Sequence, residues 1–225
     1  MDHRVPARAP SPRDAVAELT GRLAASVSLS SRRRKLQLFL QEMRPGPQTA
    51  VLDVGVSDAG YREAAGHAAT ANFFEAHYPW PQRITAVGVT DLSSFRRAFP
   101  AIRAVTADGR ELPFADGEFD VGFSNAVVEH LASREDQRRF VHELCRVARR
   151  VFVATPNRWF PLEVHTLLPL VHWLPEDRRD GVFAAVGKGE HAGLRLLGRR
   201  ELRGVFPGAV EVRNLGMTLV GFTLE

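Results

Sequence analysis

The segment Ala50–Gly55 reads AVLDVG, a short apolar run that ends in an acidic residue and a glycine. A short apolar run closed by a turn residue is typical of a buried strand. In open α/β sheets, ligands bind outside the carboxyl ends of the strands. The segment therefore predicts a strand that brings Asp53 and Gly55 to a ligand-binding edge.

Four further segments along the chain have the same character. They are Ile84–Val89, Ile102–Ala107, Phe119–Ser124 and Val151–Thr155. Helical segments lie between several of them, and the clearest spans Ser133–Arg149, where Ser133 and Asp136 resemble a capping box. Strands that alternate with helices indicate parallel βαβ units in a doubly wound sheet.

The last two apolar runs break this alternation. Ala209–Arg213 and Thr218–Leu224 are separated only by Asn214–Met217, a suitable length for a hairpin turn. We therefore expect an antiparallel pair that closes one edge of the sheet.

The N-terminal part precedes this pattern. Residues 1–12 are polar and rich in proline, and we expect a disordered tail there. Residues 13–47 carry apolar positions at helical spacing and predict two helices, the second beginning near Ser30 or Ser31. The basic run Arg32–Lys35 is interpreted as a solvated helix face, and residues 48–225 as the main domain.

The bulk composition excludes several classes of protein. The chain has 225 residues, 44% of them hydrophobic and 25% charged, which is ordinary for a globular protein. A formal charge of +4 gives no reason to expect a nucleic-acid partner. The single cysteine, Cys145, permits no intrachain disulfide, and no apolar stretch has the length of a membrane span. We expect a soluble cytoplasmic protein with no metal site.

Acidic residues follow three of the predicted strands. Asp53 follows the first, Asp91 the second and Asp108 the third. An acid after the second strand can accept both hydroxyls of a ribose, and one after the third can accept from an adenine amino group. Three such acids without a phosphate-binding loop indicate a nucleoside that lacks phosphates and carries positive charge.

Each acid also has a structural interpretation. Asp53 could cap a loop, Asp91 could cap a helix that starts at Ser93, and Asp108 could be a turn residue before Gly109. The residues alone leave these alternatives open.

The wider pattern resembles the class I S-adenosylmethionine-dependent methyltransferases, most closely the small-molecule subgroup that includes quinone methyltransferases. The resemblance rests on VLDVGVSDAG (Val51–Gly60), ADGRELPFADGEFD (Ala107–Asp120), SNAVVEHL (Ser124–Leu131) and ATPNRWFPLEVH (Ala154–His165). It implies a Rossmann-like α/β sheet of about seven strands, which the expected C-terminal hairpin would complete and the two expected N-terminal helices would precede. It also implies S-adenosylmethionine as cofactor and methyl transfer to a small-molecule acceptor.

The resemblance also implies roles for individual residues. Asp53, Gly55 and Val56 would lie at the methionine end of the cofactor, and Asp91 at the ribose. Asp108 and Gly109 would lie at the adenine, and Asn125 would line the floor of the cofactor site.

The first loop departs from the family pattern. Ser57 and Ala59 stand where the family usually has its second and third glycines, although Gly60 follows. The spacing from Asp53 to Asp91 is 38 residues (91 − 53), well above the usual spacing of about 20. We therefore expect a longer, differently shaped loop over Val56–Ala71. A non-catalytic binding protein with a degenerate cofactor loop is the alternative function.

Candidate catalytic residues follow the fourth and fifth strands. His130 and its neighbour Glu129 are placed near the methyl acceptor, where His130 would act as a base or serve a structural role. His165 is a third candidate, in a segment of unusual composition.

That segment, residues 156–198, is rich in proline, tryptophan and glycine, and is too long for a plain connection. We predict that it builds an apolar acceptor pocket around Trp159 and Phe160, with Arg158, Glu163 and His165 as polar groups. A lipid-like or aromatic acceptor would fit such a lining. The alternative is that the segment only covers the sheet or a partner in a homodimer, and the oligomeric state is left open.

Overall fold

The computed structural model describes residues 12–58, 72–163, 166 and 168–224. Its strands are β1 (Val51–Val54), β2 (Ile84–Gly88), β3 (Arg103–Thr106), β4 (Phe119–Asn125), β5 (Ala148–Pro156), β6 (Val210–Asn214) and β7 (Thr218–Thr223). They form one seven-stranded sheet in the order β3-β2-β1-β4-β5-β7-β6. The chain reverses its direction of growth between β1 and β4, which is the position where open α/β sheets bind ligands.

The first five strands are parallel, as the alternation of strands and helices predicted. The expected hairpin is confirmed, because β7 runs antiparallel between β5 and β6. Its turn is closed by Leu215 N–H donating to the Thr218 carbonyl at 2.8 Å. Gly216 supplies the positive φ of 86° that this turn requires.

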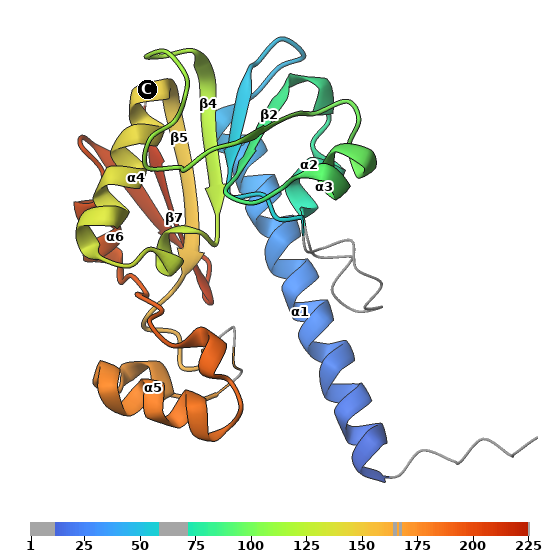
Figure 1. Ribbon diagram of the computed structural model, residues 1–225, viewed down its shortest axis with the longest axis vertical. Coiled ribbons are helices and arrows are strands. Elements are labelled where there is room, and N and C mark those ends of the chain that lie inside the picture. The colour runs from blue at the N-terminus through green and yellow to red at the C-terminus, as the bar shows by residue number, and fades with distance from the viewer. Residues whose placement is uncertain (1–11, 59–71, 164–165, 167, 225) are drawn as a thin grey trace, which may run out of the picture.

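Helices cover both faces of the sheet (Figure 1). One face carries α1 (Pro12–Met43), α2 (Phe73–His77) and α3 (Ser93–Ala98), and the other carries α4 (Arg134–Val147) and α6 (Arg199–Gly204). The α4 start is confirmed as a cap, since the Ser133 Oγ accepts from Asp136 N–H at 3.0 Å. Short 3₁₀ helices are η2 (Pro81–Arg83) and η3 (Val128–His130).

Aromatic packing fixes α1 on its face of the sheet. Phe39 is completely buried, and its ring meets those of Phe74, Phe123 and Phe152 edge-on at centroid distances of 5.0, 5.4 and 5.4 Å. Such contacts add to the free energy of burial. Phe39 therefore connects α1 with α2, β4 and β5, in a cluster that also contains Leu38 and Met43 of α1.

The prediction of two N-terminal helices is wrong, because residues 12–43 form one continuous helix. Residues 22–43 contain neither glycine nor proline, so nothing in the backbone breaks the helix. The serines form side-chain contacts instead of a cap. Ser28 Oγ accepts from Arg32 Nε at 3.4 Å, and Ser31 Oγ lies 3.5 Å from Thr218 Oγ1. The predicted tail lies outside the described residues, except that Pro12 begins α1.

Residues 156–198 leave the sheet at the carboxyl end of β5. The described part contains η4 (Val171–Trp173), α5 (Glu176–Ala185) and η5 (Gly189–His191). Figure 1 shows this segment beyond the sheet edge, on the side to which the N-terminal half of α1 also projects. The segment returns beside its own start, where Arg158 N–H donates to the Leu197 carbonyl at 3.2 Å.

Within the described part of the chain, no helix combines the length and the apolar character needed to cross a membrane.

Candidate functional site

A cavity of about 200 Å³ opens at the carboxyl ends of β1 and β4. Its lining includes Arg32 and Lys35 of α1, Asp53 of β1 and the following Gly55, Glu75 of α2, and Asn125 of β4. Of the residues predicted for the cofactor, Asp53, Gly55, Val56 and Asn125 are therefore brought together.

Gly55 allows the chain to turn sharply beside this cavity. Its φ is +117°, and a Cβ at this position would lie 2.0 Å from Cγ2 of Val127. The turn is held against β2, since the N–H groups of Gly55 and Val56 both donate to the Val87 carbonyl, at 2.8 and 3.1 Å. Any side chain at position 55 would be strained and would collide with its neighbour.

The ends of the loop after β1 are fixed, although residues 59–71 lie outside the described residues. Asn72 Nδ2 donates to the Ser57 carbonyl at 2.8 Å, and Ser57 N–H donates to Asn72 Oδ1 at 3.3 Å. Asp58 Oδ1 accepts from Phe95 N–H of α3 at 2.7 Å. The described ends of the loop are thus tied to the start of α2 and to α3, and Ser57 makes its bonds at a position where the family usually has glycine.

Asp53 and Glu75 form a buried pair of carboxyl groups. Their exposed fractions are only 5% and 4%. Burial and the neighbouring Glu75 raise the pKa of Asp53 well above its ordinary value, and burial raises the pKa of Glu75 to about 7. The two side chains are hydrogen-bonded to each other, so the pair holds a proton more tightly than an exposed carboxyl group would.

Two cations from α1 lie on another side of the cavity. Lys35 Nζ donates to Asn125 Oδ1 at 2.5 Å. Burial, and then the charge of Arg32, lower the pKa of Lys35 to about 8, while Glu129 opposes this shift. Burial also lowers the pKa of Arg32, with Glu75 acting in the opposite direction.

Glu129 and its neighbour His130 differ in exposure, although both belong to η3. Glu129 is completely buried, and its Oε2 accepts from Thr155 Oγ1 at 3.0 Å. His130 is exposed at the sheet edge, and its N–H donates to the Val127 carbonyl at 2.9 Å. Their catalytic roles stay predictions, and His165 lies outside the described residues.

The other predicted cofactor residues lie outside this cavity. Asp91 is exposed and accepts from Ser93 Oγ at 2.8 Å. It does not cap α3 with its side chain, because Asp58 takes that place. Asp108 is held by Arg110, whose Nη2 lies 2.7 Å from Oδ2. At Gly109, a Cβ would lie 2.4 Å from Cε2 of Phe140, so close packing against α4 explains this glycine.

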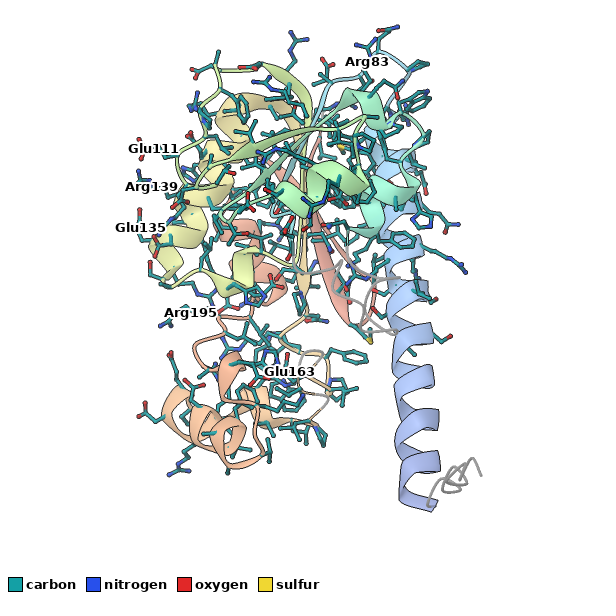
Figure 2. The ribbon with its side chains drawn as sticks, turned by 45° about the vertical axis from the view of Figure 1, so that its right-hand side comes forward. Arg83, Glu111, Glu135, Arg139, Glu163 and Arg195 are labelled. Carbon is teal, nitrogen blue, oxygen red and sulfur yellow. The ribbon has the colours of Figure 1, made fainter. Side chains whose placement is uncertain are left out.

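Two of the polar groups predicted for the acceptor pocket, Glu163 and Arg158, are already engaged. Glu163 is 1% exposed, and its Oε2 accepts from Thr166 N–H and Oγ1 at 2.6 and 2.7 Å. Figure 2 shows Glu163 beyond the sheet edge, in the same part of the molecule as α5. Arg158 Nη1 lies 3.2 Å from Glu201. Among the described residues of 156–198, none lines the cavity beside Gly55.

Sequence reasoning missed the contribution of α1 and α2. The basic run was interpreted as solvated, and this holds for Arg33 and Arg34, which are exposed. Arg32 and Lys35 instead face the cavity, because residues three apart lie on the same side of a helix. The helical spacing of Lys35 and buried Phe39, four residues apart, was the signal that could have revealed this.

Among the described residues, no group of three histidine, cysteine or acidic side chains is placed to hold a metal ion.

Comparison with known proteins agrees with this geometry. Residues 53–151 match the protein family described as "Methyltransferase domain". A search of curated proteins finds no match.

Solved structures share the fold at low sequence identity. One is an S-adenosylmethionine-dependent methyltransferase from Mesorhizobium loti, at 15% identity and a TM-score of 0.54, covering 83% of this chain and 94% of that one. Another is the PH0226 protein from Pyrococcus horikoshii, at 12% identity and a TM-score of 0.58, covering 86% of this chain and 89% of that one. At such identities the likeness shows the fold. The matched residues and this strand order therefore give the chain a methyltransferase domain with the fold of the S-adenosylmethionine-dependent methyltransferases.

Proposed function

We propose that this enzyme binds S-adenosylmethionine along the edge that begins at Gly55 and methylates a small molecule with a hydrophobic part. The acceptor is the new element of this proposal. The observation that carries it is an exposed aromatic pair on the segment that leaves β5 at the same edge.

The residues present fit the cofactor along this edge. The sheet order β3-β2-β1 places Asp108, Asp91 and Asp53 in sequence along neighbouring strand ends. This is the order in which adenine, ribose and methionine follow one another in the cofactor. Asp108 can accept from an adenine amino group while it keeps Arg110, because a carboxylate has about four acceptor sites.

The cavity at the methionine end has a matching chemistry. Gly55 lines this cavity, and the walls hold both carboxyl groups and cations. A ligand end with both charges is therefore accommodated without an unpaired buried charge.

The cofactor, when bound, supplies an electrophilic methyl group on sulfur. The protein's task is then to position an acceptor atom in line with that methyl and to exclude water. His130, exposed at the edge just after β4, is the residue we assign to removal of the acceptor's proton. Glu129 is too deeply buried for direct contact with an acceptor and holds Thr155 of β5 instead.

The aromatic pair consists of Trp159 and Trp173. Their rings are 6.2 Å apart between centroids, and the residues are 63% and 42% exposed. Exposed tryptophans that lie together are unusual unless they bind a partner or ligand. The guanidinium of Arg158 lies 5.5 Å from the Trp159 ring centroid, which keeps that ring in place.

A polar group without a partner lies next to this pair. His172 is 5% exposed, and among the described residues neither of its ring nitrogens has a hydrogen-bond partner. A hydroxyl or carbonyl on an aromatic acceptor would satisfy one of them. Aromatic walls with a few polar groups are typical of small-molecule sites.

The test is methyl transfer from isotopically labelled S-adenosylmethionine to a panel of acceptors. The panel contains quinols, simple phenols, long-chain lipids and, as a contrasting class, free sugars. Mass spectrometry detects the methylated product and the demethylated cofactor. We expect transfer to the aromatic or lipid-like members and none to sugars. Tight cofactor binding without transfer to any acceptor would favour the non-catalytic alternative.

A further inference from the structure

The residues that return from the 156–198 segment to the sheet meet η3, the short helix after β4 that contains His130. Arg195 N–H donates to the Glu129 carbonyl at 2.8 Å, and Arg195 Nε donates to the Ala132 carbonyl at 2.5 Å. Arg195 therefore binds the backbone on both sides of His130. Figure 2 shows Arg195 between the sheet and the part of the segment that contains α5.

The side chain of Arg195 also reaches α5. Its Nη2 lies 3.2 Å from Oε1 of Glu176, in the first turn of that helix, and its Nη1 donates to Oε2 at 3.3 Å. A planar guanidinium that engages both oxygens of one carboxylate fixes the relative orientation of the two groups. One side chain thus connects the backbone beside η3 with the helix of the segment.

Further contacts hold the backbone at this junction. Gln137 of α4 is completely buried, and its Nε2 donates to the carbonyls of Arg195 and of Val128 in η3, at 2.9 and 2.8 Å. Arg179 Nη1 of α5 donates to the Leu194 carbonyl at 2.9 Å. Three elements, α4, η3 and α5, therefore meet at two successive residues, and the hydrogen bonds among them resist a shift of any one.

The junction connects the two parts that the proposed function requires together. His130 is the residue assigned to the acceptor's proton, and the segment with Trp159 and Trp173 is the assigned acceptor wall. We propose that Arg195 is a positioning residue, which holds η3 and α5 together so that His130 reaches the bound acceptor. The inference rests on the proposed function and adds the residue that aligns base and acceptor. A base must lie within hydrogen-bond reach of the proton that it removes, so a small shift of η3 lowers turnover.

The coupling is tested first without an acceptor, by amide hydrogen exchange of the ligand-free protein. Arg195→Met removes both side-chain links but keeps the N–H bond to Glu129. Exchange over residues 128–132 should become about tenfold faster, since a hydrogen bond from a charged donor is lost. Glu176→Gln keeps the bond to Ala132 but weakens the link to α5, and should accelerate the same amides about two- to fivefold.

Matched controls separate this coupling from general damage. Arg178→Met removes an exposed arginine from the same helix and should leave exchange over residues 128–132 unchanged. Arg195 is substituted in preference to the completely buried Gln137, because the Arg195 side chain is 36% exposed and its removal leaves the core intact. Urea unfolding confirms that each variant is folded.

The effect on the reaction is measured with the acceptor that the panel with labelled cofactor identifies. Arg195→Met should lower kcat about tenfold. The Kd of S-adenosylmethionine should stay unchanged, because Arg195 does not line the cavity beside Gly55. In a His130→Ala background the same substitution should lower kcat no further, since Arg195 acts through His130. A merely structural role would lower kcat equally in both backgrounds.

The outcomes distinguish this inference from the proposed function. Exchange that is unchanged in Arg195→Met, or that changes there but not in Glu176→Gln, overturns the inference, because α5 is then not coupled to η3. An equal loss of kcat from Arg195→Met with and without His130 overturns it as well, and leaves the proposed function intact. Unchanged kcat in His130→Ala overturns the assignment of the base and the inference together. Absence of transfer to every acceptor overturns the proposed function, while the exchange measurements still decide the coupling.

Discussion

Glu75 illustrates how one residue acquires its properties from neighbours far away in sequence. Its carboxyl is buried against Asp53, which is 22 positions earlier (75 − 53) and on a different element. The sequence predicted Asp53 and Gly55 for the site because they close a strand, and Asn125 because of the family resemblance. It did not predict Glu75, Arg32 or Lys35, since helix positions face a site only through packing that a single sequence does not specify.

The first prediction concerns the protonation of Glu75. Its pKa is raised from 4.5 to about 7 in the folded protein, so folding favours its protonated form. The corresponding stability is fully present below pH 4.5 and is lost as the pH rises through 7. Glu75→Gln should therefore stabilise the ligand-free protein at pH 8 by roughly 1–3 kcal/mol, and by less at pH 5.

Urea denaturation at both pH values measures this effect. Glu111→Gln serves as the control, because the Glu111 side chain is 84% exposed. A variant with the same stability difference at pH 5 and pH 8 would contradict the assignment of a buried shared proton.

The second prediction concerns Gly55. Gly55→Ala should cost about 1–3 kcal/mol of stability, because it adds backbone strain and an overpacked contact. It should also weaken cofactor binding, since Gly55 lines the cavity. Adding Val127→Ala removes the atom that lies 2.0 Å from the new Cβ and should restore part of the stability. If the double variant recovers no stability, the whole loss in Gly55→Ala comes from backbone strain at the φ of +117°.

At the scale of elements, the hairpin and the α4 cap were predictable and the continuity of α1 was not. Turn length and the Ser133–Asp136 spacing are local signals, and both describe the structure correctly. The serines near residue 30 are an equally local signal, but they lie within a helix whose apolar face is held by the sheet. Tertiary packing of that face outweighed the weak preference of serine for helix ends.

The third prediction tests this packing. Phe39→Ala should destabilise the protein by about 3–5 kcal/mol, because it removes a completely buried ring and leaves a cavity. Arg33→Ala, at an exposed position of the same helix, should change the stability by less than about 0.5 kcal/mol. Urea unfolding followed by circular dichroism gives both values. Equal losses of unfolding free energy in the two variants would show that burial of the Phe39 ring is not what holds α1 on the sheet.

At the scale of the molecule, the strand order is what brings the candidate residues to one edge. Alternation of strands and helices, with three acids after three strands, was enough to predict that edge. For residues 156–198, the sequence predicted only that the segment leaves the sheet at this edge, after β5. The path of that segment depends on its own contacts, such as that between Arg158 and Leu197, which no periodicity encodes.

The fourth prediction concerns this segment. With an acceptor identified, Trp159→Ala should raise its KM about tenfold or more, since aromatic contacts contribute strongly to binding. The Kd of S-adenosylmethionine should stay unchanged, because Trp159 does not line the cavity beside Gly55. Val186→Ala, which alters another exposed apolar residue of the segment, should affect neither value. An unchanged KM in Trp159→Ala would favour a covering role for the segment.

The position of β7 has a consequence for how the chain is made. A ribosome releases β5 first, then the 156–198 segment, then β6, and β7 after all of them. Until residues 218–223 emerge, β5 presents an unpaired edge and β6 has no strand beside it. Open edges of this kind are where nascent chains associate wrongly. The sheet therefore closes late during translation, and a stall or premature stop before Thr218 would release a chain with the edge of β5 exposed.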